Sequence, residues 1–448
     1  MIIYVNPMWS MQTINSDSNY VFLTEVIRKF IDKYPNYYFI MPFPVSTGFR
    51  YYDDGFFKSQ NILRIPIKLP LGKRQNNIHF DSNFVSKIYE NFGVFVVWNQ
   101  IPEIAPQLKY LLSNYQLQPS IINQHHYIIH KTLPYPIQTD LHFIYMHLIG
   151  DHLANVNVFN SEYCWKMTLD NIREYLPNLE DSISKKKLIL KFGFFDDTYK
   201  MGNVEKYDKF TFLFNHRFQS YKNWRTTFEL FDELHKDYDF QVLVTKAGGD
   251  KINVINGKPY VRIKDLPTRK QYFEEIQKCH CNTFNSQHET FCISLLDSMH
   301  FGLSVMVPNK TTMPELLGKD NWQIFNSVEE QKEKIIQLIK NKDLLEKHGQ
   351  ANIKQANQFN VTDYVEELKK VFDKEMPTHL FDSMREHNQE NLIKKIGNKK
   401  ELKPEELKKM RSEMGLASQS MPLFKMNVIL HNLGWEQIIK DNSSFWIK

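Results

Sequence analysis

The run from His288 to Asp297, HETFCISLLD, holds two carboxylates eight residues apart. The residues before it, Cys281 to Asn285, have the pattern of a short buried strand, and apolar residues recur at helical spacing from residue 293 onwards. Glu289 should therefore precede a helix, with Asp297 two turns along it. Because free amide groups at a helix N-terminus favour anions, a diphosphate could bind the backbone of residues 290 to 293. The run predicts a phosphate-binding turn.

The two carboxylates in this run have two interpretations. Glu289 could accept hydrogen bonds from the hydroxyls of a hexose and Asp297 from those of a ribose, as expected of a sugar-nucleotide site. Alternatively, Glu289 only complements the positive end of the helix dipole, and Asp297 lies on a solvated helix face. The run by itself leaves both open.

A second segment supplies positive charge. Residues 210 to 217, FTFLFNHR, have the pattern of a strand that ends in polar and basic residues, and Lys222 precedes a helical pattern. The planar guanidinium of Arg217 fits phosphate oxygens, and Lys222 adds a point charge. Such a pair could neutralise a departing diphosphate. A solvated basic loop is the alternative.

These motifs follow one another in a characteristic order, which is Arg217 with Lys222, Gly248-Gly249-Asp250, Glu289, Asp297, and Met313-Pro314-Glu315-Leu316-Leu317-Gly318. The order resembles that of retaining GT-B glycosyltransferases of the family-4 type and covers roughly residues 205 to 360. In the N-terminal half, Asn157 to Ser161 is similar to the late strand and Asn-Ser turn of the same families. Two further pieces, residues 215 to 218 and 272 to 297, resemble tRNA-queuosine mannosyltransferases. Residues 121 to 126 resemble bacteriophage DNA α-glucosyltransferases.

The sequence departs from this family in three places. The usual Glu-Phe-Gly is replaced by Glu289-Thr290-Phe291-Cys292, so a side chain stands where a glycine would meet the diphosphate. The second glutamate is shortened to Asp297. The usual glycine-rich turn after the first strand is also missing, since Asn6-Pro7-Met8-Trp9 stands there.

The resemblance implies transfer with retained anomeric configuration, by front-face attack and without an enzyme nucleophile. In that mechanism the catalytic residues are Arg217, Lys222 and Glu289, which stabilise the leaving diphosphate and hold the sugar. The implied donor-binding residues are Asp297, Thr290, Phe291, Cys292, Gly248 and Glu315. On the acceptor side we expect His125, His126 and Asn160, which follow strands of the first predicted sheet. A merely packed or surface histidine is equally compatible with the sequence at 125 and at 126.

Alternating strand and helix patterns predict an α/β fold with two Rossmann-like, doubly wound parallel sheets facing a cleft. We expect an acceptor domain at 1–200, a donor-nucleotide domain at 207–360, a crossover helix at 361–376 and a small helical extension at 377–448. The predicted strands of the first sheet are 2–5, 37–41, 62–65, 93–97, 120–123 and 155–159, with helices near 19–33, 82–91 and 102–114. Those of the second are 209–214, 240–245, 259–263, 281–285, 303–307 and 322–325.

The extension suggests two arrangements. Helical pieces at 403–413 and 422–433 flank a glycine-containing turn, and together they could form a helix-turn-helix that binds a duplex. The alternative is a small helical pack anchored by Trp435 and Trp446.

No metal or tightly bound cofactor is expected. The four cysteines are too few and too clustered for a disulfide framework, which suits a reducing compartment. Cys279-His280-Cys281 lacks a second ligand cluster for structural zinc, which needs about four ligands. The acidic pairs Asp53-Asp54 and Asp196-Asp197 are interpreted as surface turns.

Length, hydrophobic content and net charge indicate a class of protein but do not identify its binding partner. The chain has 448 residues, 42% of them hydrophobic, which is enough for two ordinary cores. No stretch approaches the roughly 18 apolar residues of a membrane span, and no secretory signal is evident, so we expect a cytoplasmic protein, in the host if it is virus-encoded. The net charge of +5 neither requires nor excludes nucleic acid.

The acceptor separates the functional hypotheses. The resemblance favours transfer of a hexose, with UDP-glucose as the expected donor, to a hydroxymethylated base in DNA. Transfer to tRNA, or to a glycan or lipid-linked saccharide, is the alternative. A third hypothesis is an inactive binding protein on the same scaffold, for which the departures at Cys292 and Asp297 are the support.

Overall fold

The computed structural model describes the whole chain except residues 9–12, 46–48, 68–95, 114–118, 132–139, 194–203, 246–253, 267, 377–393, 395, 398, 414–429, 432–433 and 441–442. The expected helix near 82–91, the pair Asp196-Asp197 and Gly248 therefore lie outside the described residues. None of the described helices is long and apolar enough to cross a membrane.

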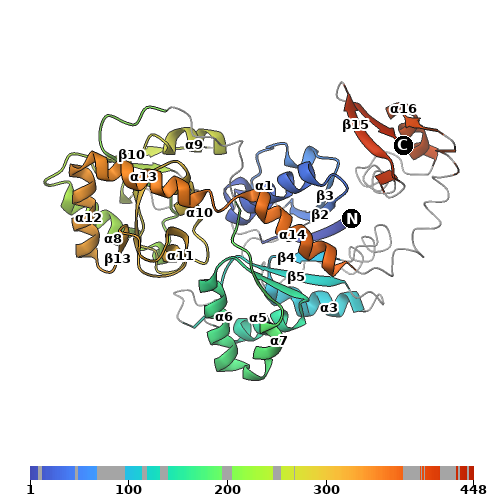
Figure 1. The fold of residues 1–448 in the computed structure, drawn as a ribbon, viewed down its shortest axis with the longest axis horizontal. Helices are drawn as coiled ribbons and strands as arrows, with labels where there is room; N and C mark the ends of the chain where they lie inside the picture. The colour runs from blue at the N-terminus through green and yellow to red at the C-terminus, as the bar shows by residue number, and fades with distance from the viewer. Residues whose placement is uncertain are drawn as a thin grey trace. The chain divides into compact units, whose positions relative to one another are not determined.

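The first sheet has seven strands in the order β3-β2-β1-β4-β5-β6-β7 (Figure 1). The pairs β2·β3, β1·β2, β1·β4 and β4·β5 are parallel, as predicted. The strands are β1 (Ile2–Asn6), β2 (Tyr38–Pro44), β3 (Ile62–Ile67), β4 (Val96–Asn99), β5 (Ser120–His125), β6 (Val156–Phe159) and β7 (Lys187–Ile189). The helices that follow these strands in sequence are α1 (Ser18–Lys33), α3 (Ala105–Ser113), α5 (Leu141–Leu153), α6 (Glu162–Tyr175) and α7 (Glu180–Ser184).

Local sequence explains these elements. Strands β1, β2, β4 and β5 are buried along their whole length, as expected of parallel strands covered on both faces by helices. Helix α1 begins after Asp17, whose carboxylate accepts the backbone N–H groups of Asn19 and Tyr20. Strand β7 was not expected, because its short, lysine-bearing sequence is only half-buried at the edge of the sheet.

The second sheet has six strands in the order β10-β9-β8-β11-β12-β13, and its pairs are parallel. All six lie where the sequence predicted strands: β8 (Thr211–Phe214), β9 (Gln241–Thr245), β10 (Val261–Lys264), β11 (Cys281–Thr283), β12 (Ser304–Pro308) and β13 (Ile324–Phe325). Its helices are α8 (Trp224–Leu234), α9 (Arg269–Ile276), α10 (Ile293–His300), α11 (Met313–Leu317), α12 (Val328–Lys340) and α13 (Lys342–Ala356). An aromatic core that includes Phe212, Phe228, Phe231 and Phe240 joins α8 to the sheet.

Backbone contacts divide the chain into two compact units. One comprises residues 1–124, 149–157 and 365–448, and the other 125–148 and 158–364. The division passes through β5, α5 and helix α14 (Val361–Glu375), which are continuous elements. In the first unit, the end of α14 packs Phe372 against Phe30 and Trp98, and Asp373 accepts a hydrogen bond from Tyr37.

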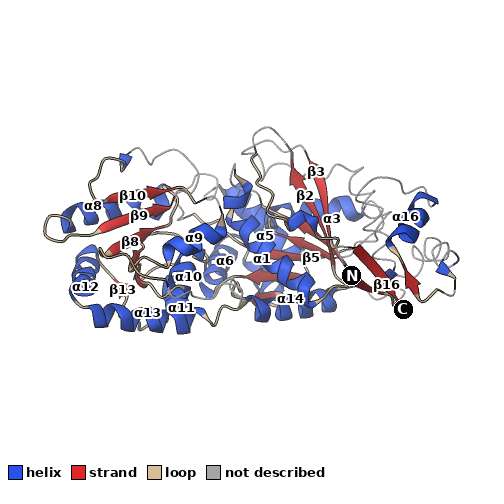
Figure 2. Cartoon of the chain, turned by 90° about the horizontal axis from the view of Figure 1, so that it is seen from above, coloured by secondary structure: helices blue, strands red, loops and turns tan. Residues whose placement is uncertain are grey.

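The C-terminal extension differs from the helical pack that we expected. Helix α16 (Pro404–Glu413) is where the sequence predicted it, but β14 (Glu401–Leu402), β15 (Glu436–Lys440) and β16 (Ser443–Ile447) form an antiparallel sheet in the order β14-β16-β15. Figure 2 shows α16 and β16 of this extension. The hairpin of β15 and β16 is signalled by β-favouring residues on either side of two polar ones, a pattern that the helical interpretation passed over. Trp435 and Trp446 are buried in this extension's own core. Most of the second helix expected for a helix-turn-helix lies outside the described residues.

Candidate functional site

The loops after β8 and β11 carry the predicted catalytic residues. These two strands are paired, so the segments that leave their carboxyl ends emerge side by side at one edge of the sheet. After β8 the chain places Arg217 and a short turn that ends at Lys222 before α8 begins. After β11 it reaches Glu289 and the start of α10. The amide of Gln287 donates to the carbonyl of Tyr221 at 2.8 Å, which ties the two loops together.

Lys222 and Glu289 form an ion pair with almost no exposure to solvent. The two side chains are 10% and 9% exposed. Burial alone would lower the pKa of Lys222, but the charge of the Glu289 carboxylate beside it outweighs burial and raises that pKa above its ordinary value. Lys222 is therefore a cation, and it lies between the loop after β8 and the loop after β11. The structure brings together two of the three predicted catalytic side chains.

Arg217, the third, lies half-buried in the same loop. Its guanidinium donates to the hydroxyl of Tyr221 at 3.1 Å. Tyr221 also places its ring under the Lys222 ammonium, 5.1 Å from the ring centroid. Tyr221 thus contacts both cations of the loop, a role that the sequence did not single out.

The N-terminus of α10 has the geometry expected of an anion site. Cys292 is its N-cap, with extended backbone and a side chain that does not cap the backbone N–H groups of the first turn. The thiol contacts the Ser294 hydroxyl at 3.4 Å, and that hydroxyl also lies 3.2 Å from Nδ1 of His216. Burial raises the pKa of the Cys292 thiol to about 12, with Glu289 adding to the effect. The thiol stays neutral and does not repel an anion at the helix end.

Asp297 is buried, not solvated, which removes the simpler interpretation of this residue. Its Oδ2 accepts a hydrogen bond from the Tyr272 hydroxyl at 3.0 Å, and its Oδ1 lies 3.5 Å from the Arg269 guanidinium. The Tyr272 hydroxyl in turn accepts a hydrogen bond from Asn215 at 2.8 Å. Asp297 therefore belongs to a polar network that links α10 to α9 and to the loop after β8. Sequence reasoning did not identify Arg269 or Tyr272 as part of the site, because a contact between two helices leaves no local pattern.

Thr290 connects the donor motif to the predicted acceptor side within the second unit. Its hydroxyl donates to the carbonyl of His126 at 2.8 Å and accepts from the Asn160 amide at 3.2 Å. The Ser161 hydroxyl donates to the Thr290 carbonyl at 2.6 Å. Phe291, next in sequence, is buried with its ring against Phe192. The structure thus brings Thr290, Asn160 and His126 together.

Glu315 has partners that the sequence did not predict. It lies in the first turn of α11, and its carboxylate accepts the backbone N–H groups of Glu162 and Tyr163 at 3.1 and 3.2 Å. Lys191 lies 3.3 Å from the same carboxylate. These amides belong to the first turn of α6, where a negative charge complements the helix dipole. Glu315 caps α6 in this structure.

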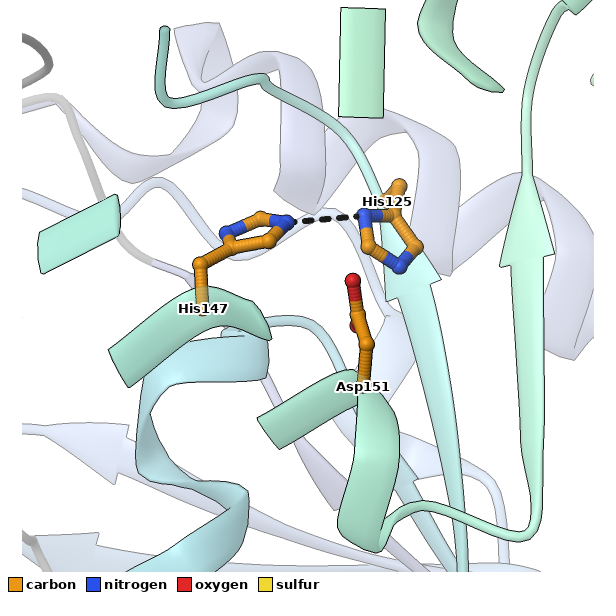
Figure 3. Close-up of side chains that lie close together, drawn as sticks. All are labelled: His125, His147 and Asp151. Atoms are coloured by element: carbon orange, nitrogen blue, oxygen red, sulfur yellow. Dashed lines mark hydrogen bonds between the residues drawn. The ribbon is translucent and has the colours of Figure 1, made fainter. Parts of the chain in front are cut away.

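The adjacent histidines at the end of β5 have different environments. His125 is fully buried, with its ring stacked on Phe159 at 4.0 Å and its Nδ1 3.2 Å from Nε2 of His147 (Figure 3). His126 is only half-buried, and burial, followed by the neighbouring His125, lowers its pKa to about 3. Of the two, His126 is the histidine that is partly exposed.

Of the acidic pairs, Asp53-Asp54 lies in the loop before the short 3-10 helix at Phe56–Lys58. Asp53 accepts the amide of Gly55 at 2.9 Å, and Asp54 accepts hydrogen bonds from Tyr20, Tyr51 and the amide of Phe56. Gly55 has a φ of 78°, a left-handed conformation that favours glycine.

Comparisons with known proteins agree with this geometry. Residues 196–355 match the family model described as glycosyl transferases group 1. A search of the curated proteins found no match. Among solved structures, sucrose-phosphate synthase from Thermosynechococcus elongatus aligns with a TM-score of 0.66 at 10% identity, over 83% of this chain and 98% of that one. The chain has the GT-B fold.

Two other structures with the GT-B fold align over similar lengths. HepE from Anabaena, in complex with UDP-glucose, gives a TM-score of 0.59 at 10% identity over 83% of this chain and 99% of that one. The lipopolysaccharide outer core galactosyltransferase WaaB gives 0.56 at 11% identity, over 84% and 99%. The names of these three proteins do not mention a nucleic-acid acceptor. The family match supports a glycosyltransferase, and its span contains the Lys222–Glu289 pair and all of α10.

Proposed function

We propose that the protein is a retaining glycosyltransferase that moves a hexose from a nucleotide sugar to an acceptor hydroxyl. The observation that carries the proposal is the buried Lys222–Glu289 ion pair beside the uncapped N-terminus of α10. A cation, a carboxylate and the first-turn amides of a helix that its N-cap side chain leaves uncapped are groups that can bind a sugar diphosphate. Cation and amides stabilise the diphosphate, and the carboxylate accepts hydrogen bonds from sugar hydroxyls.

In the proposed reaction the bond from the anomeric carbon to the diphosphate oxygen breaks, and a bond to the acceptor oxygen forms on the same face of the sugar. The acceptor's proton passes to the leaving phosphate oxygen. Arg217 and Lys222 stabilise the negative charge that develops on the diphosphate. Glu289 positions the hexose. Because two cations and a helix end supply this stabilisation, we propose that the transfer step needs no metal ion.

For the donor we propose UDP-glucose. The ligand of HepE supports this choice, since that protein was solved with UDP-glucose on the same fold. Asp297 lies too deep to contact a ribose alone, so we propose that the network of Asp297, Tyr272 and Arg269 acts as a unit on the nucleotide side.

For the acceptor we propose a hydroxymethylated base in DNA. The support is the resemblance of residues 121–126 to bacteriophage DNA α-glucosyltransferases, together with the half-buried His126 and with Asn160 beside Thr290. A tRNA or a saccharide acceptor is the alternative, and WaaB supports the saccharide. All four cysteines are free and buried, which supports our proposal of a cytoplasmic reaction.

A panel of radiolabelled nucleotide sugars tests both levels of the proposal. Each donor is incubated with hydroxymethylated DNA, unmodified DNA, tRNA and simple saccharides. We expect label from UDP-glucose in hydroxymethylated DNA alone. If label appears only in saccharide or tRNA, the proposal of a DNA acceptor is wrong, whereas the proposal of a glycosyltransferase stands. If no combination of donor and acceptor gives transfer or donor hydrolysis, the result would favour an inactive binding protein on this scaffold.

A further inference from the structure

Helix α5 and strand β5 bring together three side chains that the transfer reaction does not use. They are His125 at the end of β5, and His147 and Asp151 one turn apart on α5 (Figure 3). One ligand atom from each lies within 4.8 Å of the others, and all three side chains are buried. Two imidazoles and a carboxylate are a ligand set that suits Zn²⁺ and related divalent transition metals.

The spacing of the two imidazoles fits one shared ion. Nδ1 of His125 and Nε2 of His147 lie 3.2 Å apart. Two nitrogens bound to a tetrahedral ion at about 2.0–2.1 Å are separated by roughly 3.3–3.4 Å. Binding an ion between them therefore needs the ring that donates the shared proton to change tautomer, so that each neutral ring carries its one proton on its other nitrogen and offers the ion a lone pair. His147 and Asp151 are four residues apart on a helix, so both face β5.

The surroundings fix these groups in the way that supporting residues fix metal ligands. The His125 ring is stacked on Phe159, with 18° between the ring planes. The amide of Asn123 donates to Oδ1 of Asp151 at 3.1 Å. Such contacts orient an imidazole and a carboxylate before an ion arrives.

The backbone of α5 is also held in place beside the cluster. Gly150 lies against the carbonyl of Pro102 so closely that a Cβ there would be 2.0 Å from the oxygen. The helix that carries His147 and Asp151 is therefore fixed at the point between them.

We propose that His125, His147 and Asp151 bind one divalent transition-metal ion, with Zn²⁺ as the preferred ion, and that this ion fastens α5 to β5. The site is structural and separate from the transfer chemistry, in which no metal takes part. In this proposal His125 has a structural role, and His126 remains the histidine proposed for the acceptor side.

The test uses the full-length protein with any affinity tag removed. Chelator-treated protein is titrated with Zn²⁺ while its melting temperature is followed, and with Co²⁺ while its visible absorption is followed. We expect about one equivalent of either ion to bind, a rise in melting temperature with Zn²⁺, and the intense visible bands of a low-coordinate Co²⁺ site. These readouts do not involve activity, so they are independent of the proposed function.

Matched variants locate the ion. His147→Gln and Asp151→Asn should lose the stoichiometric binding and the thermal shift. His142→Gln, on the exposed face of the same helix, should keep both. If a variant does not fold, the wild-type Co²⁺ spectrum still decides. No Zn²⁺-dependent shift and no Co²⁺ bands in the wild type, or unchanged binding by a folded His147→Gln, would overturn the proposal and identify the cluster as hydrogen-bonded groups alone.

Discussion

The ammonium of Lys222 and the carboxylate of Glu289, 67 residues apart, form an ion pair whose two side chains are nearly withdrawn from solvent. A pair of this kind contributes little net stability, because the cost of desolvating two charges offsets their attraction. Its members are strongly interdependent all the same. Removal of either one leaves an unpaired charge in the site.

The first prediction follows from this dependence. Lys222→Met or Glu289→Leu should lower the free energy of unfolding by about 3–5 kcal/mol, while the two substitutions combined should cost much less than their sum. Urea denaturation of the four proteins measures the coupling. Additive effects in the double variant would show that the two side chains do not interact in solution.

Arg217 gives the second prediction, which concerns rate. Arg217→Ala should lower kcat/KM by roughly 10²–10³ with little change in melting temperature, because its half-buried guanidinium stabilises charge on the leaving diphosphate. Arg217→Lys should recover only part of the loss, since an ammonium lacks the bidentate fork. Initial rates of sugar transfer and of donor hydrolysis provide the measurement. The control is Lys342→Ala, whose side chain is 86% exposed. Equal rates for the Arg217 and Lys342 variants would remove Arg217 from the site.

Both parallel sheets were predictable from the sequence. Fully buried parallel strands appear as short apolar runs, and in the second sheet each predicted run became a strand. The sequence also indicated which loops meet, since the carboxyl ends of paired strands such as β8 and β11 adjoin. For this reason Lys222 and Glu289 could be expected together.

Other features depend on contacts that leave no periodic pattern. Asp297 could be interpreted as a ribose ligand or as a solvated residue, because its spacing along α10 says nothing of Tyr272 and Arg269 on α9. Glu315 was assigned to the nucleotide by motif order, whereas its structural partners are backbone amides of α6. In the extension, by contrast, Trp446 was placed in a helical pack although a local hairpin pattern, β-favouring residues on either side of two polar ones, was present in the sequence.

Glu315 leads to the third prediction. Glu315→Ala removes the acceptor for two amides at the start of α6, so we expect a loss of about 1–2 kcal/mol in the free energy of unfolding. Denaturant unfolding measures that loss, and Glu162→Ala, which keeps the cap, serves as the control. The KM for the nucleotide sugar separates capping from a donor contact. A raised KM without loss of stability would assign Glu315 to the donor after all.

The fourth prediction concerns stability at acid pH and depends on His126. Burial lowers the pKa of its imidazole from 6.5 to about 3, so the folded protein binds a proton there less readily than the unfolded chain does. The neutral ring therefore contributes stability that is fully present above pH 6.5 and is lost as the pH falls from 6.5 towards about 3. His126→Gln cannot take up this proton, and the free energy of its unfolding should fall less steeply over that range. Unfolding of wild type and variant at matched pH values measures the difference, and His142→Gln, at an exposed position, should follow the wild type. Parallel curves for the wild type and His126→Gln would mean that His126 titrates normally and is solvated in the folded protein.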